Sequence, residues 1–147
     1  MDLQGQRRYP HATDLLILAD CGGANGYRSR VWKYRLKQHL CDAHGLTVTV
    51  CHYPPGASKW NPIEHRLFSE ISKNWAGEPL VSFDTALRYI RTTKTTAGLR
   101  VQACLIPKKY PLGEKIPQAV INQLPLSPHS TLPDWNYTLF PWPTAEM

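Results

Sequence analysis

Apolar and polar residues follow each other in the first third of the chain in a pattern that predicts two strands joined by a helix. Residues 15–19 form a continuous apolar run bounded by turn residues, which is typical of a strand buried on both faces of a parallel sheet. Residues 27–44 repeat apolar side chains at helical spacing with basic residues on the other faces, and Gly45 is a suitable stop. Residues 46–51 are alternating and β-branched, which predicts a second strand and hence a parallel βαβ unit.

The second half of the chain predicts two further helices and then a tail. Asn61 and Pro62 read as a helix start, and the apolar residues that follow at four-residue spacing are Ile63, Leu67, Ile71 and Trp75. A helix over 83–91 is expected to turn Phe83, Leu87 and Ile90 inward, and residues 99–105 alternate as a strand or extension would. From residue 107 onward prolines and aromatic residues accumulate, which predicts an irregular tail pinned by aromatic anchors.

These patterns predict an α/β fold with parallel strands and flanking helices. We expect residues 1–106 to form the core, and residues 107–147 to form a proline- and aromatic-rich C-terminal extension packed on it.

Charge and cysteine usage narrow the class of protein. The 147 residues carry 17 lysines and arginines against 11 acidic residues, which gives a formal charge of +6 and favours a polyanionic partner such as nucleic acid. The 4 cysteines form no C-x-x-C pair, so we expect reduced thiols in an intracellular protein rather than a zinc ribbon or a disulfide scaffold. No apolar stretch has membrane-spanning length, and the N-terminus lacks the apolar segment of a secretion signal.

Two acids stand at the ends of expected elements. Asp20 follows the first strand, where a carboxylate can be held rigidly at the edge of a sheet, and Glu64 lies in the first turn of a helix. Hard carboxylate oxygens suit Mg²⁺ or Mn²⁺, so the pair indicates a metal site for phosphoryl transfer. The alternative stays open that Asp20 only caps its turn and Glu64 only favours its helix N-terminus.

The glycine-rich turn 22–26 allows a second interpretation. Backbone amides in such a turn can hold a phosphate, which would make the protein a nucleotide-binding α/β module. The turn lacks both the Walker lysine pattern and the G-x-G-x-x-G order, so this interpretation is the weaker one. The glycines are better explained as room for the chain to turn beside Asp20.

Basic and aromatic residues alternate in two regions, a composition suited to phosphate contacts and base stacking. The alternative is a solvated helix face above core aromatics, and we expect Trp32 to be core. The candidate nucleic-acid-binding residues are Arg28, Lys33, Lys59, Trp60, Asn61 and Arg66.

Several blocks, taken in order, resemble ISAzo-type insertion-sequence DDE transposases. They are ADCGGANGYR (19–28), VCHYPPG (50–56), SKWNPIEHRLF (58–68), SKNW (72–75) and the closing block WNYT (135–138). The resemblance implies an RNase H-like fold of the retroviral-integrase superfamily, in which three acids bind two divalent ions and direct attack on DNA phosphodiesters. It assigns Asp20 as the second acid and Glu64 as the third, with Mg²⁺ (or Mn²⁺) as cofactor and transposon ends and target DNA as partners.

The resemblance also implies that this chain lacks one of the family's three acids, because the first acid belongs to an earlier strand. Two divalent ions about 4 Å apart repel by about 4 kcal/mol even at the dielectric constant of water, so a bridging carboxylate is needed. We expect a truncated copy that lacks this Asp and the N-terminal hairpin strands, is inactive alone, and lies in the cytoplasm with the nucleoid. A complementary or full-length transposase chain could supply the missing part. The alternative is a catalytically dead remnant that still binds DNA.

Overall fold

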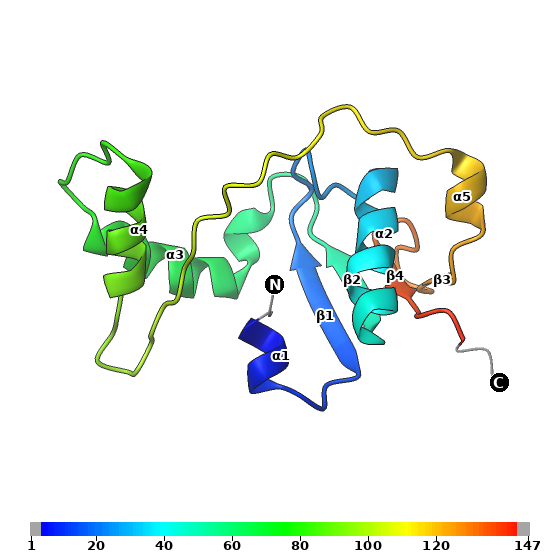
Figure 1. Ribbon diagram of the computed structural model, residues 1–147, viewed down its shortest axis with the longest axis horizontal. Helices are drawn as coiled ribbons and strands as arrows, with labels where there is room; N and C mark the ends of the chain where they lie inside the picture. Colours follow the sequence, from blue (N-terminus) through cyan, green and yellow to red (C-terminus); the bar gives the residue numbers. More distant parts are fainter. Residues whose placement is uncertain (1–3, 144–147) are drawn as a thin grey trace. The chain divides into compact units, whose positions relative to one another are not determined.

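The computed structural model describes residues 4–143, and the contacts within the chain divide it into two compact units (Figure 1). The first unit joins Met1–Pro55 with Leu112–Met147, and the second is Gly56–Pro111. The described residues after position 112 therefore pack with those before position 55, and the second unit is inserted between them in the sequence. In the described part of the chain no helix is long and apolar enough to cross a membrane.

The first unit is built on a four-stranded sheet with the strand order β1-β2-β4-β3. Strands β1 and β2 are parallel, which confirms the expected parallel pair, whereas β4 is antiparallel to both β2 and β3. The expectation of an irregular tail is wrong for β3 and β4, which continue the sheet. The elements are α1 (Gln4–Arg8), β1 (Asp14–Ala19), α2 (Arg30–Leu36), a π-helix (Lys37–Asp42), β2 (Thr47–His52), α5 (Gln118–Asn122), β3 (Leu126–Pro128) and β4 (Asn136–Leu139).

Strand β4 pairs with β2 because their alternating residues match on both faces. Val48 lies opposite Leu139 and Val50 opposite Tyr137, and all four side chains are buried. On the other face the hydroxyl oxygens of Thr49 and Thr138 lie 3.0 Å apart. Cross-strand apolar pairs and paired hydroxyls both stabilise an antiparallel ladder.

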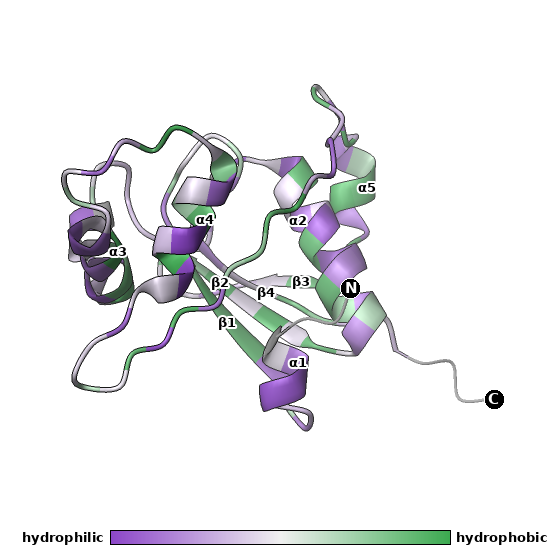
Figure 2. Cartoon of the chain, turned by 60° about the vertical axis from the view of Figure 1, so that its left-hand side comes forward, coloured by the Kyte–Doolittle hydropathy of each residue, from purple (hydrophilic) through white to green (hydrophobic). Residues whose placement is uncertain are grey.

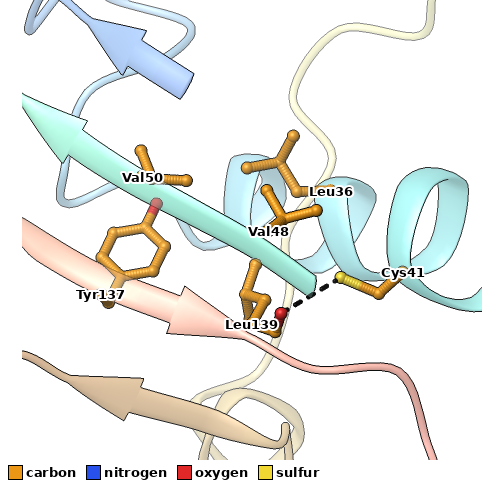
Figure 3. Packing of buried hydrophobic residues seen from close by; sticks show 6 residues of the cluster. All are labelled: Leu36, Cys41, Val48, Val50, Tyr137 and Leu139. Atoms are coloured by element: carbon orange, nitrogen blue, oxygen red, sulfur yellow. Dashed lines mark hydrogen bonds between the residues drawn. The ribbon is translucent and has the colours of Figure 1, made fainter. Parts of the chain in front are cut away.

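The core of the first unit lies on one face of this sheet, beneath α2 and the π-helix (Figure 3). The cluster consists of Leu36, Cys41, Val48, Val50, Tyr137 and Leu139, with Leu15, Ile17 and Trp32 packed against it. The Cys41 thiol donates a hydrogen bond of 3.6 Å to the Leu139 carbonyl oxygen. Trp32 was expected to belong to the core, and its contact with the cluster confirms this.

Strand β1 is the edge of the sheet, and only one of its faces is covered. Leu15 and Ile17 contact the core, but Leu16 is 60% exposed and Leu18 is 41% exposed. The expectation that this strand is buried on both faces is therefore wrong. An edge strand with exposed leucines offers unpaired backbone groups to another strand. That the sheet belongs to an RNase H-like fold stays a prediction.

The helix after β1 is shorter and less regular than its sequence pattern predicts. After α2 the chain continues as a π-helix, which brings residues five positions apart together. Lys37, expected on the basic outer surface, is only 2% exposed; it forms an ion pair with Asp42, and its ammonium lies 4.7 Å from the Trp142 ring centroid. Gly45 follows with φ +67°, a conformation that favours glycine, as expected for a helix stop.

The second unit consists of a short 3-10 helix (Ser58–Trp60), α3 (Pro62–Asn74) and α4 (Phe83–Thr92). Both α-helices occur where the sequence predicts them, and apolar residues follow one side of α3 (Figure 2). The Asn74 amide joins the helices by donating to the Tyr89 carbonyl at 2.7 Å and to the Thr92 hydroxyl at 3.0 Å.

One expectation for the second unit is wrong. Of the side chains expected to face inward, Ile71 is buried, but Ile63 and Phe83 are exposed. Of the two alternatives for residues 99–105, the strand does not form, and the pairing there is a single antiparallel bridge between Lys94 and Arg100. Periodicity located the helices correctly but overstated how much of each apolar stripe is covered.

Candidate functional site

Asp20 lies immediately after β1, at the edge of the sheet where the parallel strands end. Ala19, the last residue of β1, pairs with His52, the last residue of β2. One carboxylate oxygen of Asp20, Oδ1, accepts hydrogen bonds from the Gly22 amide at 3.2 Å and from the Asn25 side-chain amide at 3.0 Å. Both bonds fall on the same oxygen, so the turn fixes the carboxylate and leaves Oδ2 for another partner.

The glycine-rich turn is shaped around this carboxylate. A Cβ atom at Gly22 would lie 3.0 Å from Asn25 Oδ1 and 3.2 Å from Asp20 Oδ1. Both distances are tighter than ordinary van der Waals contact, so any side chain at position 22 would displace the groups that hold Asp20. The turn therefore serves a close approach to Asp20, as the sequence suggested, and this weakens its interpretation as a phosphate cradle.

A buried histidine lies beside Asp20, and sequence reasoning missed it. His52 is buried at the end of β2, with Nε2 3.4 Å from the Tyr137 hydroxyl. Burial lowers the pKa of His52, the nearby backbone of Asp20 partly opposes this, and the charge of Lys33 lowers the pKa further. The imidazole is thus favoured in its neutral form. The rule that located Asp20, that parallel strands end at a common edge, could also have found His52.

In the second unit Glu64 occupies the first turn of α3. Asn61 caps this helix: its Oδ1 accepts from the Ile63 amide at 3.2 Å, and its Nδ2 donates to Glu64 Oε1 at 3.3 Å. Both polar atoms of the buried Asn61 side chain are used in this cap, and its expected contact with DNA stays a prediction. Glu64 resembles Asp20 in that a neighbouring side chain holds one of its carboxylate oxygens.

The exposed basic and aromatic residues of the second unit lie just before and within α3. Lys59 places its ammonium 5.2 Å from the Trp60 ring centroid, and the Trp60 side chain is 70% exposed. Arg66 is exposed on the helix itself. An exposed ring beside a cation is suited to stacking on a base while contacting a phosphate.

In the first unit, Arg28 and Lys33 line a pocket of about 330 Å³ together with Tyr27 and Asp134. Lys33 is half-buried, and its ammonium lies 5.0 Å from the Tyr137 ring centroid. Burial lowers the pKa of Lys33, and the carboxylate of Asp134 opposes this effect. Asp134 was not identified from the sequence, because it lies in the loop before β4 and approaches Lys33 only when β4 joins the sheet.

The candidate site residues are distributed over both units. Asp20, Arg28 and Lys33 belong to the first unit, and Lys59, Asn61, Glu64 and Arg66 belong to the second, as does Trp60. Within residues 4–143, no group of three or more His, Cys, Asp and Glu side chains is arranged to hold a metal ion. That Asp20 and Glu64 share one ion stays a prediction.

Comparison with protein families shows that residues 2–141 match the family described as Rhodopirellula transposase DDE domain. This match covers nearly the whole chain and confirms the resemblance to insertion-sequence DDE transposases. No curated protein and no solved structure matches the chain.

Proposed function

Because the chain belongs to the family of DDE transposase domains, we propose that it acts in DNA transposition through metal-dependent cleavage and transfer of DNA strands. The observation that carries this proposal is the geometry of Asp20, which is fixed at the end of a parallel strand through one oxygen only. Catalytic carboxylates need this combination, since a ligand must be both rigid and available.

The residues around Asp20 fit a divalent cation. Beside the carboxylate, Oδ1 of Asn25 is buried without a hydrogen-bond partner among the described residues, although an amide oxygen is itself a ligand for hard cations. Asp20 and Glu64 would hold Mg²⁺, with Mn²⁺ as a substitute. A bound ion would polarise the phosphodiester and make the attacking water or 3′-hydroxyl a stronger nucleophile.

The proposed two-metal chemistry needs a third carboxylate, and Asp14 is poorly placed to be that acid. Asp14 is on the same strand as Asp20 but at its opposite end, where it is exposed and accepts a hydrogen bond from the Thr13 hydroxyl. We propose that another transposase segment or chain supplies this acid, and that the 147 residues alone bind DNA without cleaving it. The exposed edge of β1 is a suitable place for such a segment to join.

Metal binding tests the assignment of the two acids. Titration with Mn²⁺, followed by electron paramagnetic resonance, should show weaker binding after Asp20→Asn and after Glu64→Gln, because each change removes an anionic ligand. Asp14→Asn is the matched control, since it removes one carboxylate from the far end of β1 and should leave Mn²⁺ affinity unchanged. Equal affinity in the wild type and in both site variants would remove these residues from the metal site.

DNA binding tests the proposed partner separately from the chemistry. The affinity for duplex DNA should fall steeply between 50 and 200 mM salt, because neutralising phosphates releases counterions. Lys59→Ala and Arg66→Ala should weaken binding and reduce the salt dependence by about one counterion each. Arg100→Ala removes an exposed charge from a residue that is not among the candidate DNA-binding residues, and it serves as the control. An affinity that does not change with salt would contradict the proposal.

Strand cleavage separates a transposase part from a dead remnant. With Mg²⁺ or Mn²⁺, this chain alone should not nick supercoiled DNA. Nicking should appear when a second transposase chain is added that carries the earlier β-strand and the first catalytic acid. Asp20→Asn in this chain should abolish the restored nicking. Restored nicking that ignores Asp20→Asn would show that this chain contributes only DNA binding.

A further inference from the structure

The pocket formed by Tyr27, Arg28, Lys33 and Asp134 is not explained by metal binding. Two cations and one carboxylate line this pocket, so the balance of charge favours an anionic ligand that also offers a hydrogen-bond donor. Its volume of about 330 Å³ is in the range of small-molecule sites. A single phosphate would place a negative charge beside Asp134. A larger ligand that carries both an anionic group and a hydrogen-bond donor therefore fits the pocket better.

The aromatic ring of Tyr27 lines this pocket. Tyr27 stacks on Trp135 with ring centroids 4.9 Å apart and planes 20° from parallel, and the Arg28 guanidinium carbon lies 5.2 Å from the Tyr27 ring centroid. Rings and guanidinium groups in this arrangement are the surfaces on which proteins stack unpaired bases. The combination of an aromatic ring, two cations and one carboxylate suits a nucleotide.

The pocket lies beside the edge of the sheet that carries Asp20. The His52 amide donates a 3.0 Å hydrogen bond to the carbonyl of Trp135, and His52 pairs with Ala19, the residue before Asp20. A strand held in the pocket would therefore lie at the same edge of the sheet as Asp20.

We infer that this pocket binds one unpaired nucleotide of a DNA strand next to Asp20. Arg28 and Lys33 contact its phosphate, its base packs against the Tyr27 ring, and its exocyclic amino group donates to Asp134. A base within a duplex cannot bind in this way, because its faces are stacked and its amino group is paired. This inference rests on the proposed function in taking DNA as the ligand, and it adds the strand state and the base preference.

Short labelled oligonucleotides test the inference by fluorescence anisotropy at pH 8. Oligo(dC) and oligo(dT) are both flexible pyrimidine strands, but only cytosine has the exocyclic amino group that an aspartate accepts from. The wild type should bind oligo(dC) about fivefold more tightly, as expected for one hydrogen bond. Asp134→Asn should remove this preference, with tighter binding of oligo(dT) because a like charge is lost.

Matched variants distinguish the pocket from general charge effects. Asp84→Asn removes an exposed carboxylate from α4 and should leave the preference for oligo(dC) unchanged. Arg28→Ala should weaken both oligonucleotides about equally, and circular dichroism checks that each variant is folded. Equal wild-type affinity for the two oligonucleotides, or a preference that survives Asp134→Asn, would overturn the inference.

Duplex binding measured in parallel keeps the two proposals apart. If the duplex is bound in a salt-dependent way but the oligonucleotides are not discriminated, the pocket inference fails and the proposed function stands. If the preference for oligo(dC) is present while duplex binding is absent, the pocket stands and the proposed role on transposon DNA fails.

Discussion

Leu139→Ala tests whether the C-terminal strand belongs to the core. Leu139 is 0% exposed, lies opposite Val48 in the central pair of strands, and has the Cys41 thiol bonded to its carbonyl. Replacing a fully buried leucine by alanine costs transfer energy and leaves a cavity, together about 3 kcal/mol. A loss of this size exceeds what a surface substitution produces and is a large fraction of the stability of a small domain.

Urea unfolding followed by far-ultraviolet circular dichroism measures this loss. With a slope of about 2 kcal/mol per molar urea, the midpoint should fall by about 1.5 M. Phe140→Ala is the matched control, because Phe140 is the next residue and its side chain is exposed. Removing this side chain should lower the free energy of unfolding by less than about 1 kcal/mol. Hydrogen exchange of the Val48 and Val50 amides should show the same ranking. If the two variants are equally stable, β4 does not close the core and the reasoning about the tail is wrong.

Three further predictions follow from individual contacts. Burial raises the pKa of Cys41, so its thiol should react with iodoacetamide only on unfolding, while the exposed Cys104 reacts in the native state; mass spectrometry of alkylated peptides distinguishes them. Asp42→Asn leaves the ammonium of Lys37 buried beside Trp142 without its anion and should lower the free energy of unfolding by about 2 kcal/mol, whereas adding Lys37→Met should restore most of this loss. Asn74→Ala removes the bonds between α3 and α4, so hydrogen exchange in α4 should accelerate while the sheet stays protected, and equal acceleration in both would refute this.

The local elements could be predicted because their signals lie within a few residues. Helix α3 was found from its Asn61 cap, Pro62 and four-residue spacing, and β1 and β2 were found from a short apolar run and from alternation. Local sequence contains these features because capping, helical periodicity and strand alternation each act over one or two turns.

The errors share a physical cause, which is that burial depends on partners distant in sequence. The sequence around Lys37 does not show that the π-helix and the distant Trp142 will cover this side chain. The sequence around Phe83 likewise does not show that its side chain will stay exposed. Prolines around residues 126–139 predict irregular structure, but β4 forms because its alternating face fits β2 at a separation of 89 positions.

The sequence by itself determined the family, the positions of the main helices and parallel strands, and the place of Asp20 at the end of a strand. Only the tertiary structure decided what surrounds that carboxylate. The antiparallel pairing of β4 places Tyr137 beside His52, and the loop before β4 brings Asp134 into a pocket with Lys33. Such neighbours cannot be predicted from local patterns, because a site at the edge of a sheet is assembled from strand ends whose proximity is fixed by long-range pairing.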